Sequence, residues 1–120
     1  MVLENEIEFN SIDWLQDPKI HHPIVLMVDS SWSMCGCPIE DVNRWINNFV
    51  EFMKTNIPKN HYFDLCIASF DSHLYVYHNF DDCKGIKSVA FSANNDRADV
   101  VRAIVEVWFM SRNYAKSNLD

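Results

Sequence analysis

Three oxygen-bearing side chains follow directly on an apolar run in the first third of the chain. The run "IVLMVD" ends at Asp29, and Ser31 and Ser33 follow it at alternate positions. Carboxylate and hydroxyl oxygens are ligands that hard cations such as Mg²⁺ prefer, and the alternating spacing lets the three side chains point one way in an extended turn. The stretch therefore indicates one side of a cation shell. A turn or capping cluster is the alternative, because Asp and Ser form these routinely.

The residues on either side of this cluster predict a strand before it and a helix after it. A continuous apolar, β-branched run such as 24–29 is typical of a strand covered on both faces, as in a parallel sheet. Pro38 suits the first turn of a helix, and Pro58 cannot continue one. Between them, apolar residues recur with the helical period: Ile39, Val42, Ile46, Phe49, Val50, Met53 and Ile57. Ligands of open α/β sheets bind outside the carboxyl ends of the strands, which is where Asp29 would lie.

Further along, the chain predicts a hairpin and a second helix. Residues 62–70 ("YFDLCIASF") and the alternating, aromatic residues 73–80 ("HLYVYHNF") indicate two strands with a tight turn between them. An apolar face predicts a last helix over 99–114. A strand–helix–strand unit implies a parallel pair with a right-handed crossover, and the third strand is then antiparallel at an edge. The predicted fold is α/β, a Rossmann-like mixed sheet of parallel strands plus an antiparallel edge strand, with flanking helices.

Two smaller expectations concern the start of the first strand and the tryptophans. Pro18 and Pro23 bracket "KIHH", which predicts a connector rather than a strand. Trp14, Trp45, Trp108 and the Phe residues are expected in the core, because large aromatic side chains are usually well buried.

Length, composition and charge bound the class of protein. A chain of 120 residues with 48% hydrophobic and 22% charged residues suits one ordinary globular domain. The net charge of −7 disfavours nucleic acid as the main partner, since phosphate binding needs a basic surface. The N-terminus "MVLENEIEFN" lacks the apolar core of a signal peptide, and no apolar run reaches the ~20 residues of a membrane span. We therefore expect a cytoplasmic protein with no membrane partner, whose four cysteines are thiols.

The motifs carry a family resemblance. "VDSSWSM" followed by "PIEDVNRWINNFVEFM" resembles the von Willebrand factor A-type domain, in the bacterial branch often linked to tellurite-resistance operons. The family's metal-ion-dependent adhesion motif is D-x-S-x-S, which stands here as Asp29, Ser31 and Ser33. "DLCIASFDS" resembles the family's second strand and turn, and "SANNDRADVVRAI" resembles its glycine-rich loop. The resemblance, over roughly residues 20–110, implies a site for Mg²⁺ or Mn²⁺ completed by a carboxylate of a partner protein, and binding rather than catalysis.

Three departures from the family pattern bear on that site. Trp32 stands where the family usually has glycine, and Ala98 stands where it has a ligating threonine. Asp96 or Asp99 could replace the threonine, because carboxylates also ligate Mg²⁺. The family's later strand, with a further aspartate, has no counterpart in these 120 residues. The predicted metal ligands are therefore Asp29, Ser31, Ser33, Asp96 and Asp99. Residues 1–20 are predicted to be an N-terminal extension and residues 21–120 a partial domain of the family.

In the family's sheet the first strand is central, so without the later strands 24–29 would become an edge. A long apolar edge strand invites pairing. A homodimer, a second chain that supplies the missing half, or the N-terminal "EIEF" segment could cover it.

These observations leave three function hypotheses. The first is a metal-ion-dependent protein-interaction module that binds a partner's acidic side chain through Mg²⁺. The second is a metal-independent scaffold or dimerisation domain that uses the exposed strand edge. The third, a hydrolase built on Ser31 or Ser33 and a histidine, is disfavoured, because the spacing selects no histidine and no nucleophile elbow or phosphate loop is present. A zinc site at Cys35 and Cys37 is disfavoured because C-x-C stands alone.

Overall fold

The computed structural model describes residues 18–94 and 96–118 of the chain. Most of the predicted N-terminal extension, including "EIEF" and Trp14, lies outside the described residues.

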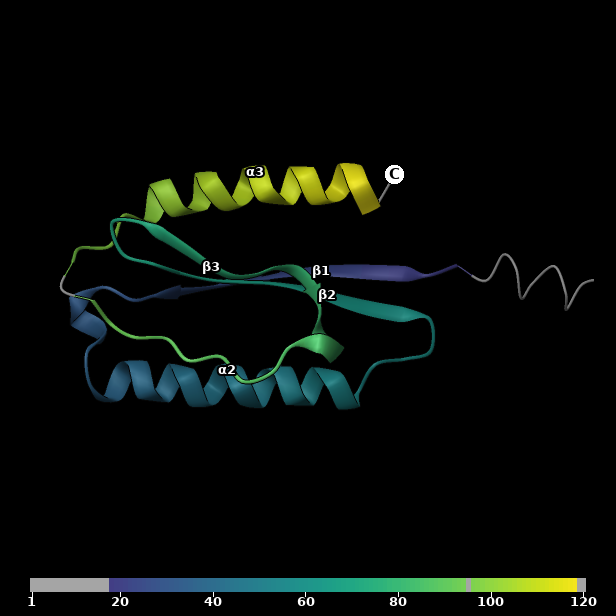
Figure 1. Ribbon diagram of the computed structural model, residues 1–120, viewed down its shortest axis with the longest axis horizontal. Coiled ribbons are helices and arrows are strands. Elements are labelled where there is room, and N and C mark those ends of the chain that lie inside the picture. The colour runs from purple at the N-terminus through teal and green to yellow at the C-terminus, as the bar shows by residue number, and fades with distance from the viewer. Residues whose placement is uncertain (1–17, 95, 119–120) are drawn as a thin grey trace, which may run out of the picture.

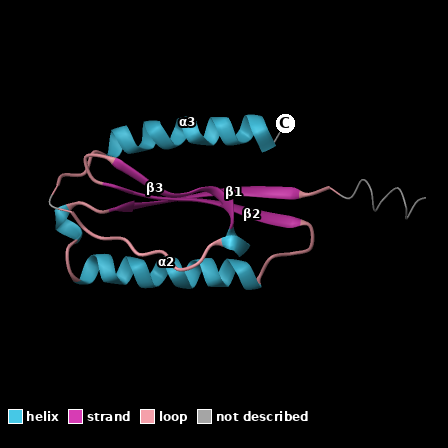
Figure 2. Ribbon diagram, in the orientation of Figure 1, coloured by secondary structure: helices cyan, strands magenta, loops and turns pink. Residues whose placement is uncertain are grey.

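A three-stranded mixed sheet with one helix on each face makes up the fold (Figures 1 and 2). The strands are β1 (Ile20–Asp29), β2 (His61–Phe70) and β3 (Leu74–Asp82), and the helices are α2 (Cys37–Thr55) and α3 (Val100–Asn118). The strand order is β1-β2-β3, with β1 parallel to β2 and β2 antiparallel to β3. The predicted α/β class, the parallel pair and the antiparallel third strand are confirmed. Short 3₁₀ turns, η1 (Trp32–Met34) and η2 (Cys83–Gly85), follow β1 and β3.

The start of β1 differs from the sequence prediction. The strand begins at Ile20, so the interpretation of "KIHH" as a connector is wrong, and the strand starts inside the range assigned to the extension. The ring of His21 stacks on that of Tyr62 with centroids 5.0 Å apart, and His22 Nε2 lies 2.8 Å from His61 Nδ1. These cross-strand ring pairs explain why a segment flanked by prolines remains extended.

Pro23 lies inside β1 without breaking the sheet, and the backbone pairing shows why. The amide of Ile20 donates to the Asn60 carbonyl, and that of Ser30 donates to the Phe70 carbonyl, both at 2.8 Å. In a parallel ladder, alternate residues of a strand bond to the same neighbour. The even-numbered residues of β1 therefore bond to β2, and Pro23 faces the other way, where its missing N–H costs the ladder nothing.

The main core lies between the sheet and α2. The even-numbered side chains of β1 pack there with the inward stripe of α2 and with the centre of β2, together with the chain after β3. Its fully buried side chains are Ile46, Val50, Leu65, Ile67, Cys83 and Ile86. As expected, β1 lies at the edge of the sheet, since among the described residues it pairs only with β2.

One flank of α2 is covered by a segment that is neither helix nor strand. In this segment, 86–93, Asn47 donates to the Val89 carbonyl and accepts from the Val89 amide, at 2.9 and 2.8 Å. Asn43 donates to the Phe91 carbonyl at 2.9 Å and accepts from the Phe91 amide at 2.6 Å. Two helix side chains thus satisfy the backbone of an extended segment much as a neighbouring strand would.

The other face of the sheet, under α3, holds a smaller cluster of Cys66, Phe80 and Tyr114, with Met110 packed against it. Beneath it Asp64 is buried, accepting a hydrogen bond from the Tyr114 hydroxyl and lying 2.7 Å from His21 Nδ1.

The expectation of a core position is wrong for Trp45 and Trp108, which are 56% and 53% exposed. It is also wrong for Phe52 and Phe109, which are 61% and 55% exposed. Ile46, which follows Trp45, takes the inward position on α2, and a step of one residue turns a helix by about 100°.

Candidate cation site at the carboxyl ends of β1 and β2

The D-x-S-x-S residues occupy the loop between β1 and α2. Asp29 ends the strand, and its Oδ1 accepts a hydrogen bond of 2.8 Å from the Ser31 amide. The hydroxyl oxygens of Ser31 and Ser33 lie 3.1 Å apart, so these two side chains point toward each other. Ser31 is buried and Ser33 exposed. The Asp29 contact is the local hydrogen bond that a turn or capping cluster would form. The facing hydroxyls of Ser31 and Ser33 also suit a shared ligand.

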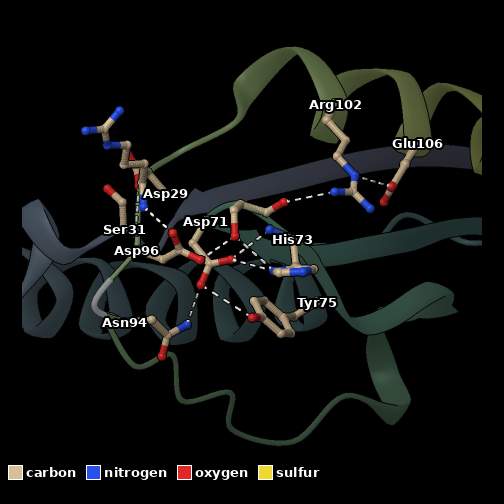
Figure 3. A network of polar contacts seen from close by, with 11 residues as sticks. Asp29, Ser31, Asp71, His73, Tyr75, Asn94, Asp96, Arg102 and Glu106 are labelled. Carbon is tan, nitrogen blue, oxygen red and sulfur yellow. Dashed lines mark hydrogen bonds and ion pairs between the residues drawn. The ribbon is translucent and has the colours of Figure 1, made fainter.

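Asp71, predicted from the sequence only as part of a tight turn, is the central carboxylate at this end of the sheet. It follows β2 directly and is 1% exposed. Its oxygens accept from the His73 amide at 2.8 Å, the Asn94 amide group at 2.9 Å and the Tyr75 hydroxyl at 3.4 Å (Figure 3). Burial and the nearby Asp71 carboxylate raise the pKa of Tyr75 above its usual value, so the phenol remains a donor. Position alone could have found Asp71, because the carboxyl ends of paired parallel strands meet at one edge.

Asp96 joins this end of the sheet from the segment before α3. Its carboxylate accepts from the Ser72 hydroxyl and from the Arg97 amide, and its carbonyl accepts from the Trp32 amide at 3.0 Å. Two hydrogen bonds hold the pKa of Asp96 below its usual value. The bond from the Ser72 hydroxyl contributes most, and the bond from the Arg97 amide contributes less. An ionised carboxylate is thereby fixed next to the loop that carries Ser31 and Ser33.

Backbone bonds connect the three loops that form the site. The Asn94 amide donates to the Ser30 carbonyl at 2.8 Å, and the Asp99 amide donates to the Asp71 carbonyl at 2.7 Å. The segment that leads into α3 therefore contacts both the loop after β1 and the end of β2.

Ligand atoms of Asp71, His73 and Asp96 all lie within 4.8 Å of one another. Asp71 is buried, whereas the other two are accessible, with 62% of the His73 side chain exposed. Only Asp96 of this group was predicted as a ligand, and Asp29 is not part of the group. The two halves of the site, the D-x-S-x-S loop and the Asp71–His73–Asp96 group, are joined through the backbone of Trp32 and Asp96.

Asp99 has a different contact from the other predicted ligands. Its carboxylate accepts a 3.1 Å hydrogen bond from the Arg102 amide in the first turn of α3. This is the bond that an N-cap residue makes, so the side chain is occupied at the helix terminus.

A serine–histidine pair does occur at this site, but its hydrogen bonds do not suit nucleophilic catalysis. Ser72 Oγ lies 2.9 Å from His73 Nδ1 and donates its only proton to Asp96. The hydroxyl can then only accept from His73, whereas a catalytic histidine must accept the nucleophile's proton. No described contact joins Ser31 or Ser33, the serines of the hydrolase hypothesis, to a histidine.

Comparisons with known proteins find a similarity in structure. No protein family and no curated protein matches the chain. The crystal structure of an uncharacterized membrane spanning protein from Vibrio fischeri is similar, with a TM-score of 0.54 and 17% sequence identity. The similarity covers 82% of this chain and 51% of that one, so this chain spans about half the length of that protein. At this identity the comparison supports the fold alone.

None of the helices among the described residues combines the length and the apolar character that crossing a bilayer requires.

Proposed function

We propose that this chain is a protein-interaction module that binds an acidic side chain of a partner through Mg²⁺ or Mn²⁺. Ser31, Ser33 and Asp96 would hold the cation, with Asp29 and Asp71 beside it. The observation that carries the proposal is the pair of facing hydroxyls of Ser31 and Ser33, 3.1 Å apart. In the same loop, the Trp32 amide donates a hydrogen bond to the backbone carbonyl of Asp96. Asp99 is left out, because its carboxylate caps α3.

The donor set fits a hard divalent cation. Carboxylate and hydroxyl oxygens suit Mg²⁺ and Mn²⁺, and the lowered pKa of Asp96 keeps that ligand ionised. The exposed ring of His73 adds a nitrogen, which Mg²⁺ rarely uses but Mn²⁺ accepts. The residues present therefore favour Mn²⁺ at least as much as Mg²⁺.

Charge explains why such a module would bind an acidic partner only with the cation. The carboxylates of Asp29, Asp71 and Asp96 lie at the same end of the sheet. The net charge of the whole chain is −7. These carboxylates repel an approaching carboxylate, and a bound divalent cation reverses the local sign and offers an open position. The chain's own residues position and orient the partner, and they make no covalent change.

The proposed setting is the cytoplasm. Cys35 and Cys37 are exposed, two residues apart and not bridged, and exposed thiols persist in reducing compartments.

Direct Mn²⁺ binding, followed by electron paramagnetic resonance and by thermal unfolding, tests the proposal. At a Mn²⁺ concentration 100 times the dissociation constant, the folded state should gain about 2.7 kcal/mol. Asp96→Asn should weaken binding at least about tenfold, because it removes a charged ligand. Glu51→Gln, which removes one carboxylate at the far end of α2, is the matched control and should leave binding unchanged. Equal binding by both variants, or no Mn²⁺ binding at all, contradicts the proposal.

A further inference from the structure

The outer edge of β1 offers a short stretch of backbone that can both donate and accept hydrogen bonds. Since the even-numbered residues bond to β2, the N–H and C=O groups of Val25, Met27 and Asp29 point away from it. Pro23 is the next outward-facing residue, and it has no N–H to offer. A strand that pairs with this edge therefore finds full bonding capacity between Val25 and Asp29.

An apolar groove runs beside this stretch, between the edge of β1 and α2. It has a volume of about 480 Å³ and is lined mainly by apolar side chains, with two aspartates: Leu26, Met27, Val28, Asp29, Met34, Asp41, Val42, Trp45 and Ile46. Trp45 forms one wall and remains 56% exposed. The other flank of α2 is covered by residues 86–93, in which Val89 and Phe91 bond to Asn47 and Asn43. Between β1 and α2, the described residues supply no such cover.

We propose that two copies of this chain associate through this edge, with β1 antiparallel to β1 of the second copy about a two-fold axis at Met27. Met27 then faces the second copy's Met27, and Val25 faces its Asp29. Each facing pair of outward residues exchanges two hydrogen bonds, which gives about six across the axis. The two three-stranded sheets become one continuous sheet, and pairing ends where Pro23 withholds its N–H.

A second copy suits this surface better than an unrelated strand, for reasons of symmetry and charge. A two-fold axis perpendicular to the sheet keeps both α2 helices on one face, so the groove and Trp45 of one copy meet those of the other. The same patch then serves both sides, as a closed dimer requires. In this register Asp29 lies opposite Val25, so the two Asp29 residues do not face each other.

The proposed dimer does not depend on the cation. It uses the outward backbone of β1 and the groove side chains, whereas the side chains of Ser31, Ser33 and Asp96 take no part. Dimerisation should therefore be the same in Mn²⁺ and in chelator, and failure of either proposal leaves the other standing.

Sedimentation equilibrium of the whole chain, with a matched pair of tryptophan variants, tests the dimer. The expected mass is twice 14.1 kDa. Trp45→Ala should raise the dimer dissociation constant on the order of tenfold or more, as for a buried aromatic anchor. Trp108→Ala on α3 should leave it unchanged. The two side chains are 56% and 53% exposed, so both substitutions leave the core intact.

A second variant and a second measurement locate the contact on the strand edge. Val25→Pro removes an outward N–H without touching the bonds to β2, and it should give a monomer. In hydrogen exchange the amides of Val25, Met27 and Asp29 should be protected in proportion to dimer population. If Val25→Pro does not fold, the exchange data and Trp45→Ala decide. A 14.1 kDa monomer at millimolar concentration, open-ended assemblies, or a dimer lost on Trp108→Ala but retained by Trp45→Ala would overturn the proposal.

Discussion

The two faces of the sheet differ in how completely a helix covers them. Under α2 lies a continuous core that includes Ile46, Val50, Leu65 and Ile67. Under α3 lie Cys66, Phe80 and Tyr114 beside the buried carboxylate of Asp64. The α2 layer is also widened by residues 86–93, which cover one flank of the helix. The comparison indicates that most of the folding free energy resides on the α2 face.

The two helices also differ on their solvent sides, since α3 exposes six large apolar side chains and α2 exposes two. On α3 the outward stripe is largely apolar, and Trp108 and Phe109 are more than half exposed, with the Arg112 guanidinium 5.0 Å from the Trp108 ring centre. A single helix can bury only one stripe. A second apolar stripe remains in water unless another element covers it.

The largest expected effect comes from releasing residues 86–93 from α2. Asn47→Ala leaves the buried amide and carbonyl of Val89 without their side-chain partner. Leaving two buried polar groups unsatisfied should lower the free energy of unfolding by about 3 kcal/mol. Urea denaturation measures this loss. Asn48→Ala, an exposed asparagine one position along α2, should cost less than about 0.5 kcal/mol, and equal losses would show that Asn47 does not hold the segment.

A matched pair of valine substitutions compares the two faces directly. Val50 on α2 and Val107 on α3 are 2% and 5% exposed, so the same methyl groups are removed from similar burial. Val50→Ala should cost about 2 kcal/mol, because its continuous core cannot collapse around the cavity, and Val107→Ala about 1 kcal/mol. Chemical denaturation of both variants gives the difference. Equal costs would contradict the claim that the α2 face dominates.

The smallest expected effect is a pH dependence that belongs to the α3 face. Burial raises the pKa of the Cys66 thiol to about 11 from its ordinary value of 9.0. The unfolded chain therefore loses this proton first, so stability is fully present below pH 9.0 and falls as the pH rises toward about 11. At pH 10, midway between these two values, the loss should be about 1.4 kcal/mol.

Cys66→Ala is the control for this pH dependence. Tyrosines and lysines also titrate in this range, so the difference between the unfolding free energies of the two proteins isolates the thiol. That difference should change across the interval, and a constant difference would exclude Cys66 as the cause.

The strand order and the helices followed from local patterns, because the periods of β2, β3 and α2 are set by alternation and by the helical repeat. The packing of residues 86–93 against α2 could not be predicted from local patterns. Asn43 and Asn47 resemble a solvated helix face in sequence, and nothing near Val89 marks it as their partner. Trp45 was misplaced because the helical period does not show that no described residue covers the flank of α2 beside β1.

The sequence predicted the candidate site where its residues are contiguous or lie in a recognisable loop. Asp29, Ser31 and Ser33 form a motif within five residues, and the loop resemblance pointed to Asp96. Asp71 resembles any aspartate of a hairpin turn. Its burial depends on Tyr75 and on Asn94, and Asn94 reaches it from a loop 23 residues further along the chain.

The paired asparagines on α2 have a consequence for the evolution of this chain. Four residues of helix advance about 6 Å, and two residues of extended backbone advance nearly the same, about 6.6 Å. Asn43 and Asn47 can therefore bond to Phe91 and Val89 together, because the two repeats coincide over that distance. One residue inserted between Val89 and Phe91 would shift one of these two residues away from its asparagine and break that pair of hydrogen bonds. Substitutions at Ser88 and Ala90 should be tolerated here, whereas changes in length should not.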